Sequence, residues 1–451
     1  MRSFAVVSCV TLLAVGGWAS GSFAHMGAKF EPADGQVIHG LGQYVPAAAG
    51  YSDADNWQFV TDYQTAVGHV PVIYAAYQAI DPVVAFLDNT DLTDIVQNHG
   101  HPYHLNLGLF LFDLTQENID VAAILGGDYD TQIAAIAAEV KALGVSTFCR
   151  PGFEFGAPDG LHGDNISGPD FILVWHYIRG VFDTVGVENV AWVWNAVNPN
   201  TFNYMSYYPG DAAVDWWGIN YFTTSQMNNS EAFVLDAATH GKPVIICESC
   251  PIHNGGTGNA ANWQNWFVPY FGKITGHAHL KAFTYISDPW DRPGFFDWWD
   301  TSLIDANTPA TLRTNYAAEM DDSRYIHHGP LQALTLTVVN DAWGDVEIVP
   351  DPVDANDPDL LGYLPGMWVR LEANAIDGKG FKQWELYDPN HPGDANHMVV
   401  DANAVTLLTM DADHEVTGVF KCGSGVGVAF PLMALAACAV AFAMRRRHPR
   451  R

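Results

Sequence analysis

The chain has 451 residues, of which 49% are apolar, and this is enough for one large domain and one small domain. It contains 50 acidic and 20 basic side chains, so its formal net charge at pH 7 is −30. A surface of this charge repels nucleic acids and other polyanions, so a nucleic-acid partner is excluded and neutral ligands are favoured.

Residues 1–24 have the pattern of a secretory signal. Arg2 is followed by an apolar stretch and then by small residues that end at Ala24. This order predicts cleavage after Ala24 and export across the inner membrane.

Residues 25–328 contain eight short apolar runs, separated by segments with helical spacing. The runs cover residues 36–43, 70–77, 104–111, 145–153, 190–197, 214–222, 243–249 and 281–288. The intervening segments 130–144 and 171–186 each end at a glycine, as helices often do. Eight strand–helix repeats predict an α/β fold of the (β/α)8 TIM barrel type. A doubly wound open sheet fits less well, because no Gly-rich phosphate loop follows the first run.

Residues 331–421 change to alternating strands with turn signals, which predicts a small all-β domain. Its spaced glycines and aromatic residues resemble the internalin-type B repeats of bacterial surface proteins, which implies a spacer or adhesive module. The acidic stretch 351–359 lacks the pattern of an EF-hand, and this favours a solvated loop over a calcium site.

Residues 422–451 form a C-terminal tail with an apolar span at 426–444 and a cluster of arginines after it. Nineteen apolar residues are long enough to cross a bilayer, so we expect a membrane anchor with its C-terminus in the cytoplasm. The tail also resembles the C-terminal sorting signals of bacterial surface proteins, which would imply removal of the tail during anchoring.

Two glutamates stand out among the eight of the predicted barrel. The active site of a (β/α)8 barrel forms at the C-terminal ends of its strands, and only Glu154 and Glu248 lie there, on the fourth and seventh strands. Glycosidic hydrolysis requires two carboxylates on opposite sides of a cleft. The alternative is a pair of structural acids in ion pairs. Because unpaired buried carboxylates are costly, the pattern favours catalysis.

The neighbours of Glu154 suggest how it is tuned. Strand alternation predicts that Arg150 points into the barrel beneath Glu154, and that Cys247 points outward. Phe153 and Phe155 should desolvate Glu154 and raise its pKa, as a general acid needs. Arg150 would oppose that rise if it contacts Glu154, and would keep Glu248 ionised if it leans that way instead. The sequence leaves both arrangements open.

Aromatic residues are dense near the predicted mouth, and their rings suit the C–H faces of sugars. Trp194, Trp217, Tyr221 and Trp290 are candidate substrate-binding residues, together with Arg150. For any one of the rings, core packing is an equally good explanation.

Histidines at 98–104 lack interleaved carboxylates and enter the third strand at its N-terminal end, so we expect no metal ion and no cofactor.

Cys247 and Cys250 form a single C-x-x-C pair, which is a weak metal or redox signal. Buried free thiols or one disulfide, which could involve Cys149, are the favoured interpretations.

Six stretches together resemble clan A glycoside hydrolases, and most closely those of the family 26 type. They are 30–43, 150–155, 190–195, 207–222, 241–251 and 281–291. The resemblance implies a retaining mechanism with Glu154 as acid/base, Glu248 as nucleophile, and Tyr221 hydrogen-bonded to that nucleophile. Phe153 occupies the place of a family 26 histidine or of the asparagine in other clan A families. Asn195 is a candidate to supply the missing polar contact.

The combined expectation is an exported, surface-anchored, monomeric endo-β-glycanase. Its substrate would be a neutral polysaccharide such as β-mannan, mixed-linkage β-glucan or xylan. The alternative is a non-catalytic carbohydrate-binding or adhesive protein built on the same barrel.

Overall fold

The computed structural model divides the chain into two compact units, Met1–Leu331 and Gln332–Arg451. The residues it describes are 26–32, 34–43, 53–80, 92–97, 103–111, 120–155, 166–187, 189–252, 256–288, 301–304, 307–327, 336–340, 343–349, 367–376, 378–387, 397–410 and 414–422. The predicted signal 1–24, the acidic loop 351–359 and the apolar span 426–444 lie outside these residues.

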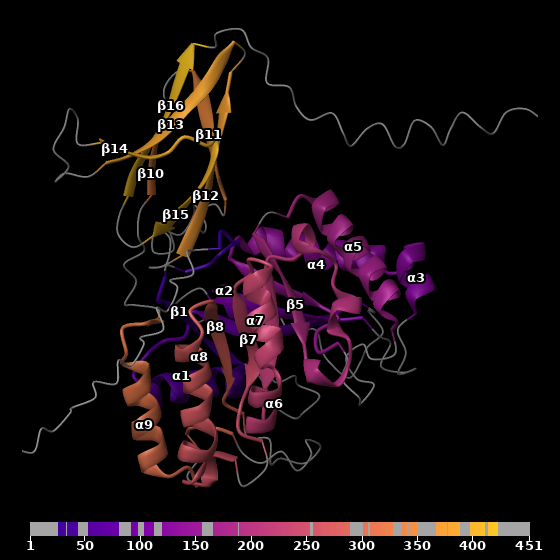
Figure 1. The fold of residues 1–451 in the computed structure, drawn as a ribbon, viewed down its shortest axis with the longest axis vertical. Coiled ribbons are helices and arrows are strands. Elements are labelled where there is room, and N and C mark those ends of the chain that lie inside the picture. Colours follow the sequence, from indigo (N-terminus) through magenta and orange to yellow (C-terminus); the bar gives the residue numbers. More distant parts are fainter. Residues whose placement is uncertain are drawn as a thin grey trace, which may run out of the picture. The chain divides into compact units, whose positions relative to one another are not determined.

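Eight parallel strands form a closed barrel in the first unit (Figure 1). They are β1 (Val37–Gly42), β2 (Ile73–Ala79), β3 (His104–Phe110), β4 (Thr147–Pro151), β5 (Val190–Ala196), β6 (Trp216–Tyr221), β7 (Val244–Ser249) and β8 (Leu280–Ile286). Each strand pairs with the next along the chain, and β1 pairs with both β8 and β2 to complete the ring. The predicted (β/α)8 barrel is therefore confirmed, and the open doubly wound sheet is ruled out.

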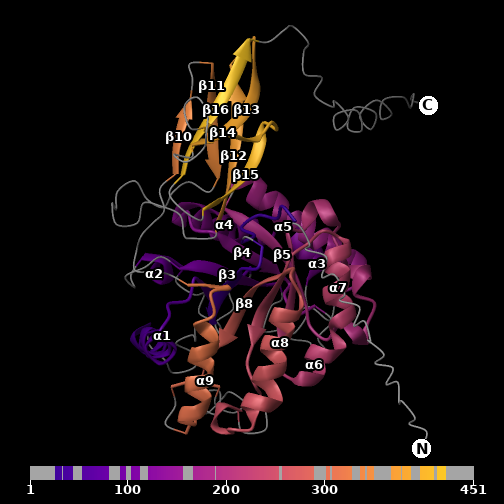
Figure 2. The same ribbon diagram turned by 60° about the vertical axis from the view of Figure 1, so that its left-hand side comes forward.

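Helices surround this barrel in both views (Figures 1 and 2). They are α1 (Asp53–Val67), α2 (Leu92–Gln97), α3 (Val121–Gly126), α4 (Asp130–Leu143), α5 (Gly168–Val185), α6 (Thr224–Asn229), α7 (Glu231–Thr239), α8 (Val268–Gly276) and α9 (Ala310–Met320). The two predicted helix stops are confirmed, because Gly144 and Gly186 cap α4 and α5 with φ angles of 68° and 75°. Glycine adopts this left-handed conformation without steric cost.

The N-terminal segment closes the barrel at the end where the strands begin. The indole nitrogen of Trp216 donates a hydrogen bond to the carbonyl of Lys29 at 2.7 Å. The buried ring of Phe30 packs edge-on against Phe148 at 5.8 Å. These contacts seal the end opposite the predicted active site.

A hydrogen-bonded histidine pair ties the end of the barrel unit to β1. His327 follows the short strand β9 (Tyr325–Ile326), and its Nε2 lies 2.8 Å from the carbonyl oxygen of Met320. Burial lowers the pKa of both histidines, so His327 is neutral at pH 7; it donates to this carbonyl through Nε2 and accepts through Nδ1 from Nδ1 of His39, 2.9 Å away. His39 then accepts from the hydroxyl of Tyr63 at 2.8 Å. This arrangement requires both imidazoles to be neutral.

The described residues of the second unit form two β-sheets. Their strands are β10 (Leu336–Asn340), β11 (Gly344–Val349), β12 (Met367–Ala375), β13 (Lys379–Tyr387), β14 (His397–Asp401), β15 (Val405–Met410) and β16 (His414–Cys422). One sheet has the order β10-β16-β13-β14 and the other β11-β12-β15. Trp384, Leu371 and Phe420 form part of the core between them. The resemblance to B repeats is untested and stays a prediction.

No helix within the described residues has both the length and the apolar character needed to cross a bilayer. The predicted membrane span at 426–444 is not among the residues to which this finding applies.

Several buried histidines predict that the barrel loses stability in acid. Burial lowers the pKa of His104 and of His327 to about 4, and that of His39 well below its ordinary value of 6.5. Between pH 6.5 and 4 the unfolded chain binds protons at these sites while the folded chain does not. The free energy of unfolding therefore decreases as the pH is lowered through this range. For His104→Gln we expect the fall in unfolding free energy between pH 6 and 5 to be shallower by about 1 kcal/mol per pH unit.

Urea denaturation at several pH values measures this slope. The exposed His176→Gln variant serves as the control for loss of an imidazole. An equal slope in His104→Gln and the wild type would contradict the interpretation.

Candidate active site

Glu154 is positioned by a turn rather than by strand alternation. β4 ends at Pro151, and both Gly152 and Glu154 have φ angles of 57°. A residue with a side chain rarely adopts this left-handed conformation, so Glu154 is held there by its surroundings. The residue is almost fully buried, with 9% of its surface exposed.

The two phenylalanines that flank Glu154 anchor this turn on different neighbours. The ring of Phe155 stacks on Trp194 with 4.8 Å between centroids. The ring of Phe153 packs edge-on against Phe110, also at 4.8 Å. Both rings are buried, so the backbone on each side of Glu154 is fixed by apolar packing.

Arg150 pairs with Glu248 inside the barrel. Its Nη1 lies 2.7 Å from Oε1 of Glu248 and 2.9 Å from Oδ1 of Asn195. Burial alone would lower the pKa of Arg150, but the adjacent Glu248 carboxylate outweighs that effect and raises it. The open question from the sequence is thus resolved: Arg150 contacts Glu248.

Aromatic rings flank the rest of the guanidinium. The Cζ atom of Arg150 lies 4.9 Å from the ring centroid of Phe153 and 5.6 Å from that of Tyr77. Nε and Nη2 have no hydrogen-bond partner within the described part of the chain, and cation–π contact partly compensates for this. Phe153 therefore packs on the cation that holds Glu248.

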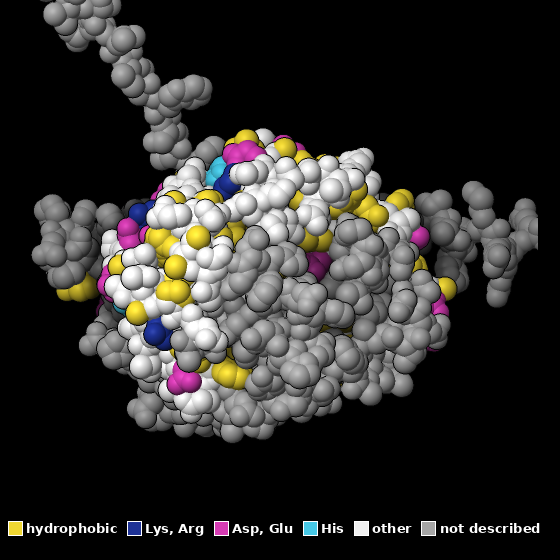
Figure 3. All heavy atoms as spheres, turned by 90° about the horizontal axis from the view of Figure 1, so that it is seen from below, with side chains coloured by type: hydrophobic (Ala, Val, Ile, Leu, Met, Phe, Trp, Pro, Cys, Tyr) yellow, Lys and Arg dark blue, Asp and Glu magenta, His cyan; other side chains and the backbone are white. Residues whose placement is uncertain are grey.

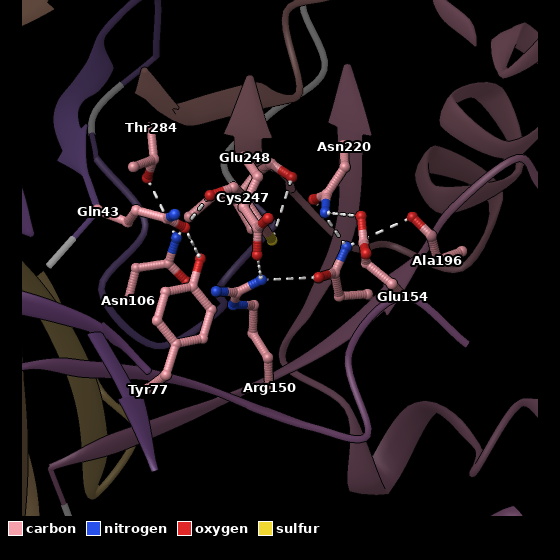
Figure 4. Close-up of polar contacts among 12 residues, drawn as sticks. Gln43, Tyr77, Asn106, Arg150, Glu154, Ala196, Asn220, Cys247, Glu248 and Thr284 are labelled. Atoms are coloured by element: carbon pink, nitrogen blue, oxygen red, sulfur yellow. Dashed lines mark hydrogen bonds and ion pairs between the residues drawn. The ribbon is translucent and has the colours of Figure 1, made fainter. Parts of the chain in front are cut away.

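Asn220 of β6 makes the polar contact to Glu154. Its Nδ2 donates a hydrogen bond to Oε1 of Glu154 at 2.6 Å, and its Oδ1 accepts one from Nδ2 of Asn195 at 3.2 Å. The two glutamates are thus joined through Arg150, Asn195 and Asn220 (Figure 4). Asn195 was a candidate to contact Glu154 itself, but it donates instead to Asn220, and Asn220 donates to Glu154.

An irregularity in strand pairing corrects the predicted direction of Cys247. The β6–β7 register shifts between Ile219 and Asn220, so regular alternation fails there. The sulfur of Cys247 lies 2.7 Å from where a Cβ on Gly218 would stand, next to Asn195 and therefore on the inner face. The carbonyl of Cys247 accepts a hydrogen bond from Asn106 at 2.8 Å (Figure 4).

The expected role of Tyr221 is also corrected. Its hydroxyl lies 2.8 Å from Oγ of Ser230, not at Glu248, because neighbouring residues of a strand face opposite sides and Asn220 takes the inner one. Tyr77 is the tyrosine near Glu248. Burial and then the Glu248 carboxylate raise the pKa of Tyr77, so its hydroxyl stays protonated and donates to Gln43 at 3.0 Å.

The candidate sugar-stacking tryptophans are core residues where the structure describes them. Trp194 and Trp217 are fully buried and lie 4.8 Å apart in an edge-to-face pair. Trp217 also packs on Phe233 of α7, at 4.8 Å, which places it on the outer face of the barrel. The packing alternative therefore explains both rings. Trp290 lies outside the described residues.

Glu31 is a third buried glutamate, but it lies at the closed end of the barrel. It accepts hydrogen bonds from the backbone N–H groups of Met26 and Ala28 and lies 4.0 Å from Lys281, near the start of β8. This position supports the choice of Glu154 and Glu248 by their place on the strands.

The cysteines and histidines show no metal-binding cluster within the residues described. Cys149, Cys247 and Cys250 are buried free thiols, so the structure favours that interpretation over a disulfide among them. His104 is buried and accepts a hydrogen bond from the N–H of Ser146 at 3.0 Å. The predicted absence of a metal ion or cofactor stays a prediction.

The surface seen from below the view of Figure 1 shows mixed apolar and acidic side chains and few lysines or arginines among the residues described (Figure 3). This agrees with the net charge of −30. Such a surface favours a neutral ligand over a polyanion.

Comparison with known proteins identifies distant relatives. The Beta-1,3-xylanase of Alcaligenes sp is 25% identical over 65% of this chain and 67% of its own length. The Beta-1,3-xylanase TXYA of Vibrio sp is 24% identical over 65% of this chain and 68% of its own length. Both relatives are glycoside hydrolases. No protein-family model matches the chain.

A structural likeness is found to the modular endo-beta-1,4-mannanase of Cellulomonas fimi, a family 26 glycoside hydrolase. It is 15% identical, has a TM-score of 0.46, and covers 86% of this chain and 94% of its own. The barrel assignment rests on the strand order of this chain and not on that likeness.

The buried pair of Arg150 and Glu248 predicts a strong energetic coupling. Arg150→Met should lower the unfolding free energy at pH 7 by about 3–5 kcal/mol, because it leaves Glu248 buried without its partner. The double variant Arg150→Met/Glu248→Gln should regain part of that loss, since no charge then remains buried. Chemical denaturation of the wild type, both single variants and the double variant measures the coupling, and additive losses would contradict the pairing.

Proposed function

We propose that the protein is a retaining endo-β-glycanase that uses Glu154 as acid/base and Glu248 as nucleophile. The observation that supports this most is that two buried carboxylates, from β4 and β7, are joined by one series of hydrogen bonds. Structural acids would more simply pair with separate cations. Here Arg150 pairs with Glu248, and the neutral amide of Asn220 donates a hydrogen bond to Glu154.

The chemistry follows from these two environments. Glu248, which accepts a hydrogen bond from Arg150 at Oε1, would attack the anomeric carbon through Oε2 as Glu154 protonates the departing glycosidic oxygen. The glycosidic C–O bond breaks and a glycosyl ester forms on Glu248. Glu154, now ionised, takes a proton from water, and the water oxygen displaces Glu248 to release the sugar.

The substrate we propose is a neutral β-linked polysaccharide. The relatives' names make β-1,3-xylan the first to test, with β-mannan and mixed-linkage β-glucan next. The net charge of −30 supports a neutral polymer over an acidic one.

The cellular location and domain roles remain proposals from the sequence alone. Residues 1–24 would direct export, residues 422–451 would anchor the protein at the cell surface, and residues 331–421 would act as a spacer for the monomeric barrel of 25–328.

The roles of the two carboxylates predict distinct losses of activity. Glu154→Gln should reduce kcat on β-1,3-xylan by about 10²–10⁴-fold, because it removes the proton donor. Glu248→Ala should abolish release of reducing sugar, since no covalent intermediate can form. Glu31→Gln is the matched control, a buried glutamate at the other end of the barrel, and should keep its activity. Cleavage by Glu248→Ala at the wild-type rate would refute the nucleophile assignment.

The stereochemistry of the product provides a separate prediction. Double displacement should release the β-anomer first, and mutarotation to the α-anomer should follow. Proton NMR of the first minutes of hydrolysis records the anomeric signals. Initial appearance of the α-anomer would mean that water attacks directly, and that Glu248 is a general base.

A further inference from the structure

The hydrogen bonds that join Glu248 to Glu154 through Arg150, Asn195 and Asn220 have a fixed donor-to-acceptor direction. A guanidinium has donors only, so Arg150 must contact the amide oxygen of Asn195. Asn195 therefore turns its NH2 group toward Oδ1 of Asn220, 3.2 Å away. Asn220 in turn must present its own NH2 group to Glu154, with 2.6 Å between Nδ2 and Oε1. Arg150 thus determines which end of Asn220 faces Glu154.

We propose that Asn220 is a positioning residue that confines the proton of Glu154 to Oε2 and favours release of that proton. The proposal rests on the function proposed for Glu154 as acid/base. An oxygen that accepts the N–H of Asn220 cannot hold an acid proton in the same direction. Oε2 is therefore the oxygen that gives the proton to the leaving group and later takes one from water.

Two ionisable side chains close to Glu154 are occupied or neutral. Arg150 of β4 is engaged with Glu248, and Cys247 of β7 interacts electrostatically with both Glu154 and Glu248. Burial raises the pKa of the Cys247 thiol to about 12, so it stays neutral. The N–H of Asn220 donates to Oε1 of Glu154, and a donor in this position favours the charged form of a carboxyl group.

The first test is the pH dependence of kcat/KM in Asn220→Ala. Loss of the donor should move the alkaline limb, which reports the acid/base, upward by about half to one pH unit. Activity on β-1,3-xylan should fall by about 10–100-fold, within the range for general acid catalysis. The loss should be smaller on an aryl β-xyloside with a dinitrophenol leaving group, which departs without protonation. An unmoved alkaline limb would overturn the proposal.

Two further variants separate positioning from folding. Asn195→Ala leaves Asn220 in place but frees its orientation, so it should move the limb in the same direction by a smaller amount. Asn189→Ala is the matched control, because Asn189 is a buried asparagine that donates to the carbonyls of Val140 and Val145, both at 2.8 Å. It should lower stability and leave the limb unchanged. An equal shift in Asn189→Ala would assign the effect to general destabilisation.

A titration separates this proposal from the proposed function. Carbon-13 NMR of carboxyl-labelled glutamate, with Glu154→Gln to assign its signal, follows the ionisation of Glu154 without any substrate. A rise in its pKa in Asn220→Ala supports the positioning role even if the wild type cleaves none of the polysaccharides tested. An unchanged titration overturns the proposal even if the wild type is an active glycanase.

Discussion

The ion pair between Arg150 and Glu248 is the interaction on which the rest of the site depends. Both groups are withdrawn from water inside the barrel, where an unpaired charge would be strongly destabilising. The same nitrogen of Arg150 that holds Glu248 also orients Asn195, and through it Asn220 and Glu154. Arg150 therefore influences both carboxylates. It acts on Glu248 directly, through its charge, and on Glu154 indirectly, because it fixes the orientation of the side-chain amides of Asn195 and Asn220.

The second constraint is the turn that carries Glu154. A positive φ at a residue with a side chain costs about 1–3 kcal/mol, and such strain persists only where the surroundings enforce it. Phe153 and Phe155 supply that enforcement through separate aromatic contacts. Phe153 also lies over the guanidinium of Arg150. Phe153 thus stabilises the cation, while Asn220 on another strand makes the polar contact to Glu154.

The fold and the two glutamates could be predicted from the sequence because each follows from strong local signals. Apolar runs separated by segments with helical spacing identified the eight strands, and strand position separated Glu154 and Glu248 from Glu31. The sequence-based predictions fail at positions where side chains do not alternate regularly between the two faces of a strand. They also fail where the residue pattern does not distinguish the inner face of the barrel from the outer face. The register shift at β6–β7 turned Cys247 inward, and a one-residue offset on β6 placed Asn220 inside and Tyr221 outside. Dense tryptophans mark packing as readily as sugar binding, and Trp194 and Trp217 proved to be packing residues.

The most direct test of the account is to trap the covalent intermediate. A 2-deoxy-2-fluoro β-xylobioside with a good leaving group should glycosylate the nucleophile, with loss of that leaving group, and turn over slowly, because the fluorine destabilises both oxocarbenium-like transition states. Peptide mass spectrometry of the inactivated protein should then find one fluoroglycosyl group on Glu248. A label on any other residue, or an inverting enzyme that cleaves xylan and takes no label, would contradict the assignment of Glu248 as the nucleophile.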